Sequence, residues 1–434
     1  GSSVTQFTYD GTTYTLDQTD SSEQEFTFTE GSLFITTQGE VRFEPNRDLD
    51  HSVGDIVKNI VVTSIDSDSD VQTSTVTLTI TDGDIPTIDV IPPVSLSESS
   101  LADGSAPSGS AVSQTETISF TNQSDDVDHF RIATDEFNPS GTLTSNGLAV
   151  ELREFPEDSG QYTGFTTNAL NQEVEVFTLN FDDVVLGRYT FILLEALDHE
   201  DGLDNNSLNF DLPVYAVDSD GDDSAMSPLT VTIEDDVQGM SNGALTIEEP
   251  TVADLAAGVV TTTTIDVMPE QSADGATITQ FTYGGGTPLL LDQTDTGEQE
   301  FIFTEGSLFI TLEGDVRFEP NRNLNHESGP IVKSIVVTSS DGDVDVETAT
   351  VVLTITDGDI PTIESVPSVS LSETQLADGS TPSGSAVSQT ETISFTNQSD
   401  DVEKLRLEPT EFNVGGALTS NNITVELKED PVDS

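Results

Sequence analysis

Aspartate residues recur on alternate positions in three loops of the sequence, and each loop lies between two runs rich in Val, Ile and Thr. More acidic residues directly follow the second run. The loop residues, each set followed by its later acidic residues, are Asp66, Asp68 and Asp70 with Asp82 and Asp84; Asp218, Asp220 and Asp222 with Glu234, Asp235 and Asp236; and Asp341, Asp343 and Asp345 with Asp357 and Asp359. Alternation directs several oxygens at one point, and only a cation offsets their mutual repulsion. The pattern predicts sites for a hard cation.

The elements that position these loops are predicted to be β-hairpins. The runs 214–217 and 229–233 have the β-branched composition of strands, and helical periodicity is almost absent from the chain. The loops are not EF-hands, because positions 6 and 12 counted from Asp218 are Asp223 and Leu229 instead of Gly and Glu. Oxygen-rich, irregular loop sites favour calcium over magnesium. Zinc is disfavoured by the absence of Cys and by only four scattered His.

Composition narrows the function classes. Eighty acidic residues against 12 basic ones give a formal charge of -68, which excludes nucleic acid and disfavours an anionic membrane surface. No apolar run approaches the roughly 18 residues that cross a bilayer, so direct membrane insertion is not expected. An exported chain without cysteine needs a stabiliser other than disulfides, and metal serves that role. A solvated halophilic surface or disorder would also be acidic, but strand signals and loop-clustered carboxylates favour metal binding.

An internal repeat defines the domain organisation. Pro107–Val127 is identical to Pro382–Val402, 21 residues at an offset of 275. The repeat predicts alternating domains of two types, A and B. They are type A at 1–86 (N-terminally truncated), type B at 87–236, type A at 237–361 and type B at 362–434 (C-terminally truncated). About seven short strands per unit predict an all-β fold of tandem immunoglobulin-like β-sandwiches rather than barrels. Strands of about ten residues in series predict a rod on the order of 150 Å long.

A second element recurs upstream of each acidic hairpin. It reads Leu49-Asp50-His51, Leu197-Asp198-His199-Glu200 and Leu324-Asn325-His326-Glu327. The three His share one position, which favours a packing or loop-orienting role over a ligand role. A Glu on a predicted first strand accompanies the element, at Glu98, Glu248 and Glu373.

Residues 197–200 resemble the Leu-Asp-Arg-Glu element of cadherin-like domains. The acidic residues that follow the second strand of each hairpin, here called the exit, resemble the interdomain linkers of those domains. Together with "SLFI…RFEPN", the hairpins resemble the repeat domains of giant type I-secreted RTX adhesins of Gram-negative bacteria, over essentially the whole chain. The resemblance implies a calcium-rigidified extender on the bacterial surface. It would project an adhesive tip for attachment or biofilm formation, with calcium ions and neighbouring repeats as partners and a host or abiotic surface reached through other domains.

The resemblance also implies further calcium ligands, namely Asp50, Glu98, Asp198, Glu200 and Glu327. Ser52 and Asn325 depart from the family pattern, which expects Glu and Asp at these places. Extracellular modules of this kind bind calcium with dissociation constants on the order of 10⁻⁴–10⁻³ M.

Other function classes have weaker support in the sequence. No catalytic Ser-His-Asp context, P-loop or nucleotide fingerprint is present, so we do not expect an enzyme. The alternative to a structural extender is a ligand-binding module, a reader of carbohydrate or protein, in the type-B domain. The insertion at 105–171 in this domain carries the aromatic residues Phe155, Tyr162 and Phe165. Repetition favours a structural spacer over a reader.

The sandwich geometry also predicts where ions lie. In an immunoglobulin-like sandwich, a domain's hairpin tip and its exit cluster lie at opposite poles, so they share metal only across junctions. Asp82 and Asp84 should meet the tip at 218–222, with Asp50 beside them. Glu234 and Asp236 should meet the tip at 341–345, and this second group should include Glu98, Asp198 and Glu200. The sets at 66–70 and at Asp357 and Asp359 should be poorly occupied.

Overall fold

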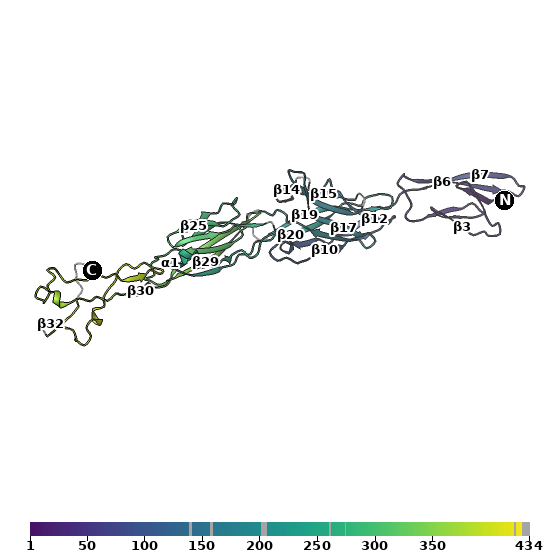
Figure 1. Cartoon of the computed structure of the whole chain (residues 1–434). Helices are drawn as coiled ribbons and strands as arrows, with labels where there is room; N and C mark the ends of the chain where they lie inside the picture. Colours follow the sequence, from purple (N-terminus) through teal and green to yellow (C-terminus); the bar gives the residue numbers. More distant parts are fainter. Residues whose placement is uncertain are drawn as a thin grey trace. The chain divides into compact units, whose positions relative to one another are not determined.

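The computed structural model describes residues 1–138, 141–156, 159–200, 206–259, 262–273, 275–420 and 422–427. It is all-β apart from short helical turns, as predicted (Figure 1). The chain divides into two compact units. The first consists of Gly1–Gly239, Glu270–Ala276 and Ser340–Glu347, and the second consists of Met240–Pro269, Thr277–Ser339 and Thr348–Ser434.

The first unit begins with a sandwich of two sheets. One sheet has the order β2-β1-β6-β7 and the other β3-β4-β5. Their strands are β1 (Ser3–Tyr9), β2 (Thr12–Thr15), β3 (Gln24–Phe28), β4 (Gly31–Ile35), β5 (Val41–Pro45), β6 (Ile56–Ile65) and β7 (Val71–Ile80). Phe7, Leu33 and Ile60 are buried between the sheets. β6 and β7 form the first acidic hairpin.

A larger second sandwich follows within the same unit. Its sheets have the orders β10-β18-β17-β16-β15 and β12-β19-β20-β9. Their strands are β9 (Val94–Ser97), β10 (Val112–Thr117), β12 (Val127–Ile132), β15 (Glu151–Glu154), β16 (Gln161–Thr167), β17 (Glu173–Asp183), β18 (Arg188–Leu193), β19 (Ser207–Asp218) and β20 (Ser227–Glu234). Small pairs join β8 (Thr87–Val90) to β11 (Ser119–Thr121) and β13 (Thr144–Ser145) to β14 (Leu148–Ala149). The 3₁₀ turn η1 spans Glu98–Ser100.

Aromatic side chains fill the core of the second sandwich. Phe130, Tyr162 and Phe177 are each at most 1% exposed. The Tyr162 hydroxyl accepts a hydrogen bond from Ile132 N at 3.1 Å, which satisfies this buried polar atom. Gly164 lets the Phe177 ring approach, because a Cβ there would lie 2.4 Å from the ring. Tyr162 and Phe165 are therefore core residues, and their interpretation as ligand-contacting aromatics is wrong.

The second unit contains a third sandwich, with sheet orders β21-β29-β28-β23-β24 and β22-β27-β26-β25. The strands are β21 (Gly243–Glu248), β22 (Ile265–Asp266), β23 (Ala276–Tyr283), β24 (Leu289–Leu290), β25 (Gln299–Phe303), β26 (Gly306–Ile310), β27 (Asp315–Pro320), β28 (Ile331–Asp341) and β29 (Val346–Thr356). Sequence periodicity missed α1 (Val252–Ala257), which a Thr251–Asp254 capping box begins and a left-handed Gly258 ends. No helix in the described ranges has the length and apolar character needed to cross a bilayer.

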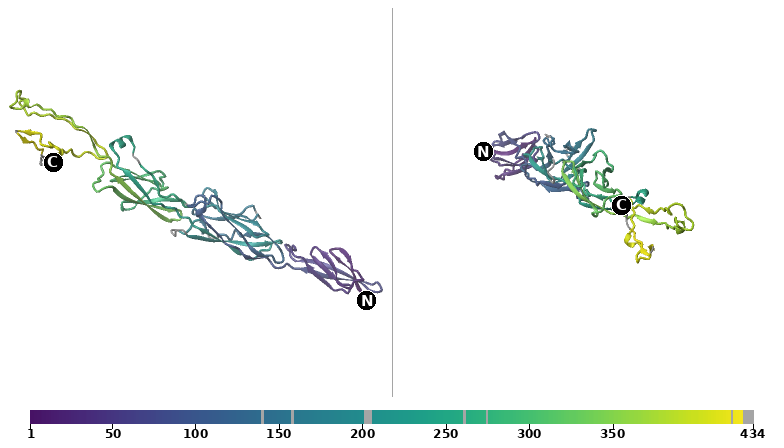
Figure 2. Two further views of the ribbon diagram at one scale, coloured as in Figure 1. Left: turned by 90° about the horizontal axis from the view of Figure 1, so that it is seen from below. Right: turned by 90° about the vertical axis from the view of Figure 1, so that its left-hand side faces the viewer.

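The described residues after 361 form two-stranded pairs instead of paired sheets (Figure 2). β30 (Thr362–Ser365) pairs with β31 (Ser394–Thr396), and β32 (Thr419–Ser420) pairs with β33 (Ile423–Thr424). The 3₁₀ turns η2 (Glu373–Gln375) and η3 (Pro409–Glu411) lie between them. The assignment of 362–434 as a truncated type-B domain stays a prediction, as do the other domain boundaries.

Candidate metal centres

The three acidic hairpin tips share one backbone turn. The backbone N–H of the first Asp donates to the carbonyl oxygen of the fifth residue of the turn, as in Asp218 N to Asp222 O at 3.1 Å and Asp341 N to Asp345 O at 3.2 Å. The first carboxylate in turn accepts from the backbone N–H of the fifth residue, at 2.8 Å in the former tip and 2.7 Å in the latter. The first Asp therefore orders the turn, and the remaining carboxylates project from it.

The Asp220 cluster consists of Asp82, Asp125 and Asp220, whose nearest oxygens all lie within 4.8 Å of one another. It joins the exit of the first sandwich to the tip of the second, and Asp222 also interacts with Asp82. Burial raises the pKa of the Asp125 carboxyl, as do the nearby charges of Asp220, Asp48 and Asp82. One buried oxygen of Asp125 and one of Asp220 have no hydrogen-bond partner in the described structure. A cation would satisfy both.

The Asp235 cluster consists of Asp235, Asp343 and Asp345, which are 1%, 5% and 0% exposed. Asp343 and Asp345 come from the hairpin tip that belongs to the first unit. Both carboxylate oxygens of Asp343 and one of Asp235 are buried without a hydrogen-bond partner. Burial, together with the charges of Asp343 and Glu98, raises the pKa of Asp235 to about 7. Three buried carboxylates at this spacing fit the all-oxygen ligand sets that calcium takes.

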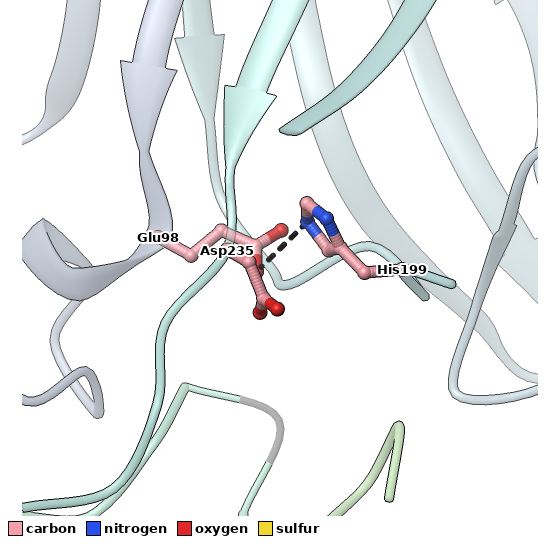
Figure 3. Close-up of side chains that lie close together, drawn as sticks. All are labelled: Glu98, His199 and Asp235. Atoms are coloured by element: carbon pink, nitrogen blue, oxygen red, sulfur yellow. Dashed lines mark ion pairs between the residues drawn. The ribbon is translucent and has the colours of Figure 1, made fainter. Parts of the chain in front are cut away.

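Asp235 also borders a buried pair formed by Glu98 and His199 (Figure 3). His199 Nε2 lies 3.5 Å from Glu98 Oε2, and each side chain is 1% exposed. The other carboxylate oxygen of Glu98 accepts from Leu197 N at 2.7 Å. Burial alone would lower the pKa of His199, but Glu98, Asn206 and the charge of Asp235 together raise the pKa to about 9. The His ring thus carries a positive charge among the carboxylates at neutral pH.

The same arrangement recurs in the third sandwich. His326 Nε2 lies 3.3 Å from Glu249 Oε2, Glu249 Oε1 accepts from Leu324 N at 3.0 Å, and Asp357 completes the group. The first-strand Glu is therefore Glu249, which is 2% exposed. The assignment of this role to Glu248 is wrong, because Glu248 faces solvent. His199 and His326 are both buried beside a Glu, and the packing role of these two side chains stays a prediction.

The remaining predicted ligands fall into four groups. Asp66, Asp68 and Asp70 lie within 4.8 Å of one another at their own tip, where backbone N–H groups of Asp70 and Asp68 lower the pKa of Asp66. Asp236 is buried, and its carboxylate accepts from Ser105 N and Ala273 N at 2.8 and 3.0 Å. Seven others belong to none of the clusters that the described structure brings together: Asp50, Asp84, Asp198, Glu200, Glu234, Glu327 and Asp359.

The carboxylates of two of these seven residues accept hydrogen bonds from backbone N–H groups instead. Asp50 accepts from Ser52 N at 3.0 Å, and Asp198 accepts from Gly147 N at 2.8 Å. Asp218, Asp222 and Asp341 remain beside the clusters as turn-forming or bridging residues, and burial raises the pKa of Asp218 to about 6. Sequence reasoning missed Asp125, although its recurrence as Asp400 in the identical repeat was a signal for it.

The sheets and their order define the class of protein: tandem β-sandwich domains. No protein-family model and no curated protein matches the sequence. Solved structures of cadherin repeats do match. Drosophila N-cadherin EC1-3 is 13% identical with a TM-score of 0.25, covering 79% of this chain and 91% of its own. Mouse cadherin-23 EC22-24 is 13% identical with a TM-score of 0.25, covering 80% and 90%.

Proposed function

We propose that this chain is a calcium-rigidified structural extender of a bacterial cell-surface adhesin. The observation that carries the metal-binding part is the Asp235 cluster, in which three carboxylates are at most 5% exposed. Moving an unpaired charge from water into a protein interior costs several kcal/mol, and like charges add repulsion. Protonation relieves this cost at low pH, and a divalent cation relieves it at neutral pH.

The Asp220 cluster supports the same function at a second place. It joins an exit residue, Asp82, to a tip residue of the following sandwich, Asp220. A cation bound by both would bridge the two domains, because Asp82 follows the last strand of the first sandwich and Asp220 lies at the hairpin tip of the second. The proposal is that bound cations stiffen the junctions at the predicted domain boundaries, which lie at 86/87, 236/237 and 361/362.

The extracellular, bacterial part of the proposal rests on the sequence resemblance to RTX adhesin repeats. The formal charge of -68 and the absence of cysteine are compatible with it. Calcium at extracellular concentrations would load sites with dissociation constants on the order of 10⁻⁴–10⁻³ M, whereas cytosolic calcium would leave them empty. The adhesive ligand would be contacted by other domains.

Calcium titration of the full chain tests the proposal. Calorimetry should detect binding, chelation by EGTA should lower the melting temperature, and added calcium should restore it. Small-angle scattering should show larger maximum dimensions in calcium than in EGTA. Equal melting temperatures in calcium and EGTA would show that the acidic loops are merely solvated, and an unchanged scattering profile would reject the stiffening role.

A further inference from the structure

A set of direct hydrogen bonds joins the first and second sandwiches beside the Asp220 cluster. Asp48 N donates to Ser124 O at 3.3 Å, and Asp126 N donates to Asp48 Oδ1 at 2.7 Å. Arg47 Nη2 donates to Gln123 O at 3.0 Å. We call this contact, between residues 47–48 and the loop 122–126, the clasp.

The linker that follows β7 adds further hydrogen bonds to the same loop. Asp84 N donates to Ser124 Oγ at 2.9 Å, and Ser124 N donates to Asp84 O at 3.3 Å. Gly83 is required for this approach, because a Cβ at its position would lie 1.8 Å from Ser124 Oγ. Gly83 thus serves the contact between domains, while the preceding Asp82 is the candidate metal ligand.

The same contact occurs in the second unit, at the repeated loop 397–401. Asn323 N donates to Ser399 O at 3.3 Å, Asp401 N donates to Asn323 Oδ1 at 2.7 Å, and Arg322 Nη2 donates to Gln398 O at 2.9 Å. Asp359 N donates to Ser399 Oγ at 3.0 Å, and a Cβ on Gly358 would lie 1.9 Å from that oxygen. Two copies at different places show that the contact is a property of the sequence pattern.

Comparison of the two copies separates the clasp from cation binding. Asp48 in the first copy is replaced by Asn323 in the second, and the accepted hydrogen bond keeps its length of 2.7 Å. The acceptor therefore does not depend on a carboxylate charge. The Arg47–Asp126 ion pair is more than half exposed and is expected to contribute little. Hydrogen bonds to backbone groups carry the contact.

We propose that the clasp docks the end of a type-A domain onto the type-B domain that follows it, independently of bound cation. The A–B pair then moves as one block, and chelation loosens other junctions first. The clasp also specifies order. Type-A domains place Arg47 or Arg322 two residues before the Leu of the Leu-X-His element, whereas the type-B domain places Glu195 there. A carboxylate at that position cannot donate to a carbonyl oxygen.

Distance measurement in the full chain tests the clasp. The sequence contains no cysteine, so Thr75→Cys on β7 and Ser113→Cys on β10 place two spin labels at exposed positions of the first and second sandwiches. Double electron–electron resonance should give one narrow distance distribution in calcium and the same distribution in EGTA. The double variant Arg47→Glu/Ser124→Ala, built on the labelled chain, should lose the narrow distribution in EGTA.

Arg42→Glu is the matched control, because it makes the same charge change on β5, where Arg42 pairs with Glu23 and Glu44 away from the clasp. It should behave as the parent chain does. A broader distance distribution for the parent chain in EGTA than in calcium would overturn the proposal. A narrow distribution for the clasp variant in EGTA would also overturn it, as would a broad distribution for the control. Calcium binding measured on the same samples tests the extender function separately, since the clasp can hold whether or not calcium binds.

Discussion

Replacing Asp235 by Asn should have opposite effects on stability with and without calcium. Burial raises the pKa of Asp235 to about 7 from an ordinary value of 3.8. The folded state therefore holds this proton more tightly than the unfolded chain does. The stabilisation from the protonated group is fully present below pH 3.8 and is lost as the pH rises through 7.

The pKa shift sets the size of the effect. One pKa unit corresponds to about 1.4 kcal/mol, so a shift of about 3 units corresponds to at most about 4 kcal/mol of destabilisation above pH 7. Asp235→Asn removes the charge and retains an oxygen that can accept from Asp236 N, as Asp235 Oδ1 does at 2.7 Å. In EGTA at pH 7.5 the variant should melt above the parent chain, by on the order of 10 °C for a domain of this size.

Calcium should reverse the order of the two melting temperatures. The variant lacks one charged ligand, so it should bind calcium more weakly and gain less stability from it. Differential scanning calorimetry at pH 7.5 and pH 5.0, in EGTA and in calcium, measures all four conditions. At pH 5.0 in EGTA the parent carboxyl is protonated, and the two melting temperatures should converge.

Asp135→Asn is the control for the loss of one charge, because Asp135 is exposed on the second sandwich. It should leave both melting temperatures close to those of the parent. The reasoning fails if Asp235→Asn lowers the melting temperature in EGTA at pH 7.5, or if calcium stabilises the variant as much as it stabilises the parent.

Three further predictions concern single substitutions. Asp125→Asn should weaken calcium binding in a calorimetric titration, whereas Asp128→Asn, at an exposed position nearby, should not; equal affinities would remove Asp125 from the site. Val344→Gly should raise stability by on the order of 1 kcal/mol in thermal melting, because Val344 has a φ of 73° where the equivalent tip residue is Gly221, while Val346→Gly should lower it. Phe177→Ala should cost about 3–5 kcal/mol in denaturant unfolding, because Phe177 is fully buried, and a smaller loss would indicate that the core closes over the cavity.

Strand patterning made the fold predictable. The alternating Val, Ile and Thr runs locate the acidic hairpins, and β20 (Ser227–Glu234) and β29 (Val346–Thr356) lie where the runs indicated. The helix α1 was missed because its six residues are too short to establish a 3.6-residue period. Its capping box and Gly258 were signals that a search for helix ends could have used.

The site was predictable in its residue types but not in its register. Successive side chains of a strand point to opposite faces, so a residue beside a buried Ile faces solvent. Ile233 is buried and Glu234 is exposed, which places Asp235 in the cluster. Ile247 is buried and Glu248 is exposed, which places Glu249 beside His326. Extending the alternation one residue past each strand would have selected both residues correctly.

Asp125 could not have been identified from the alternation of side chains along a strand. It is distant in sequence from the hairpins, and only the folded loop 122–126 brings it within 4.8 Å of Asp82 and Asp220. The clasp has the same origin, since Ser124 and Asp126 flank Asp125 and make its contacts to the first sandwich. Asp125 adds to the negative charge of the cluster, and its position is set by Ser124 and Asp126, which make the hydrogen bonds between the domains. Because those hydrogen bonds position Asp125 beside Asp82 and Asp220, we expect the Asp220 cluster to bind a cation or a proton, either of which would relieve the repulsion.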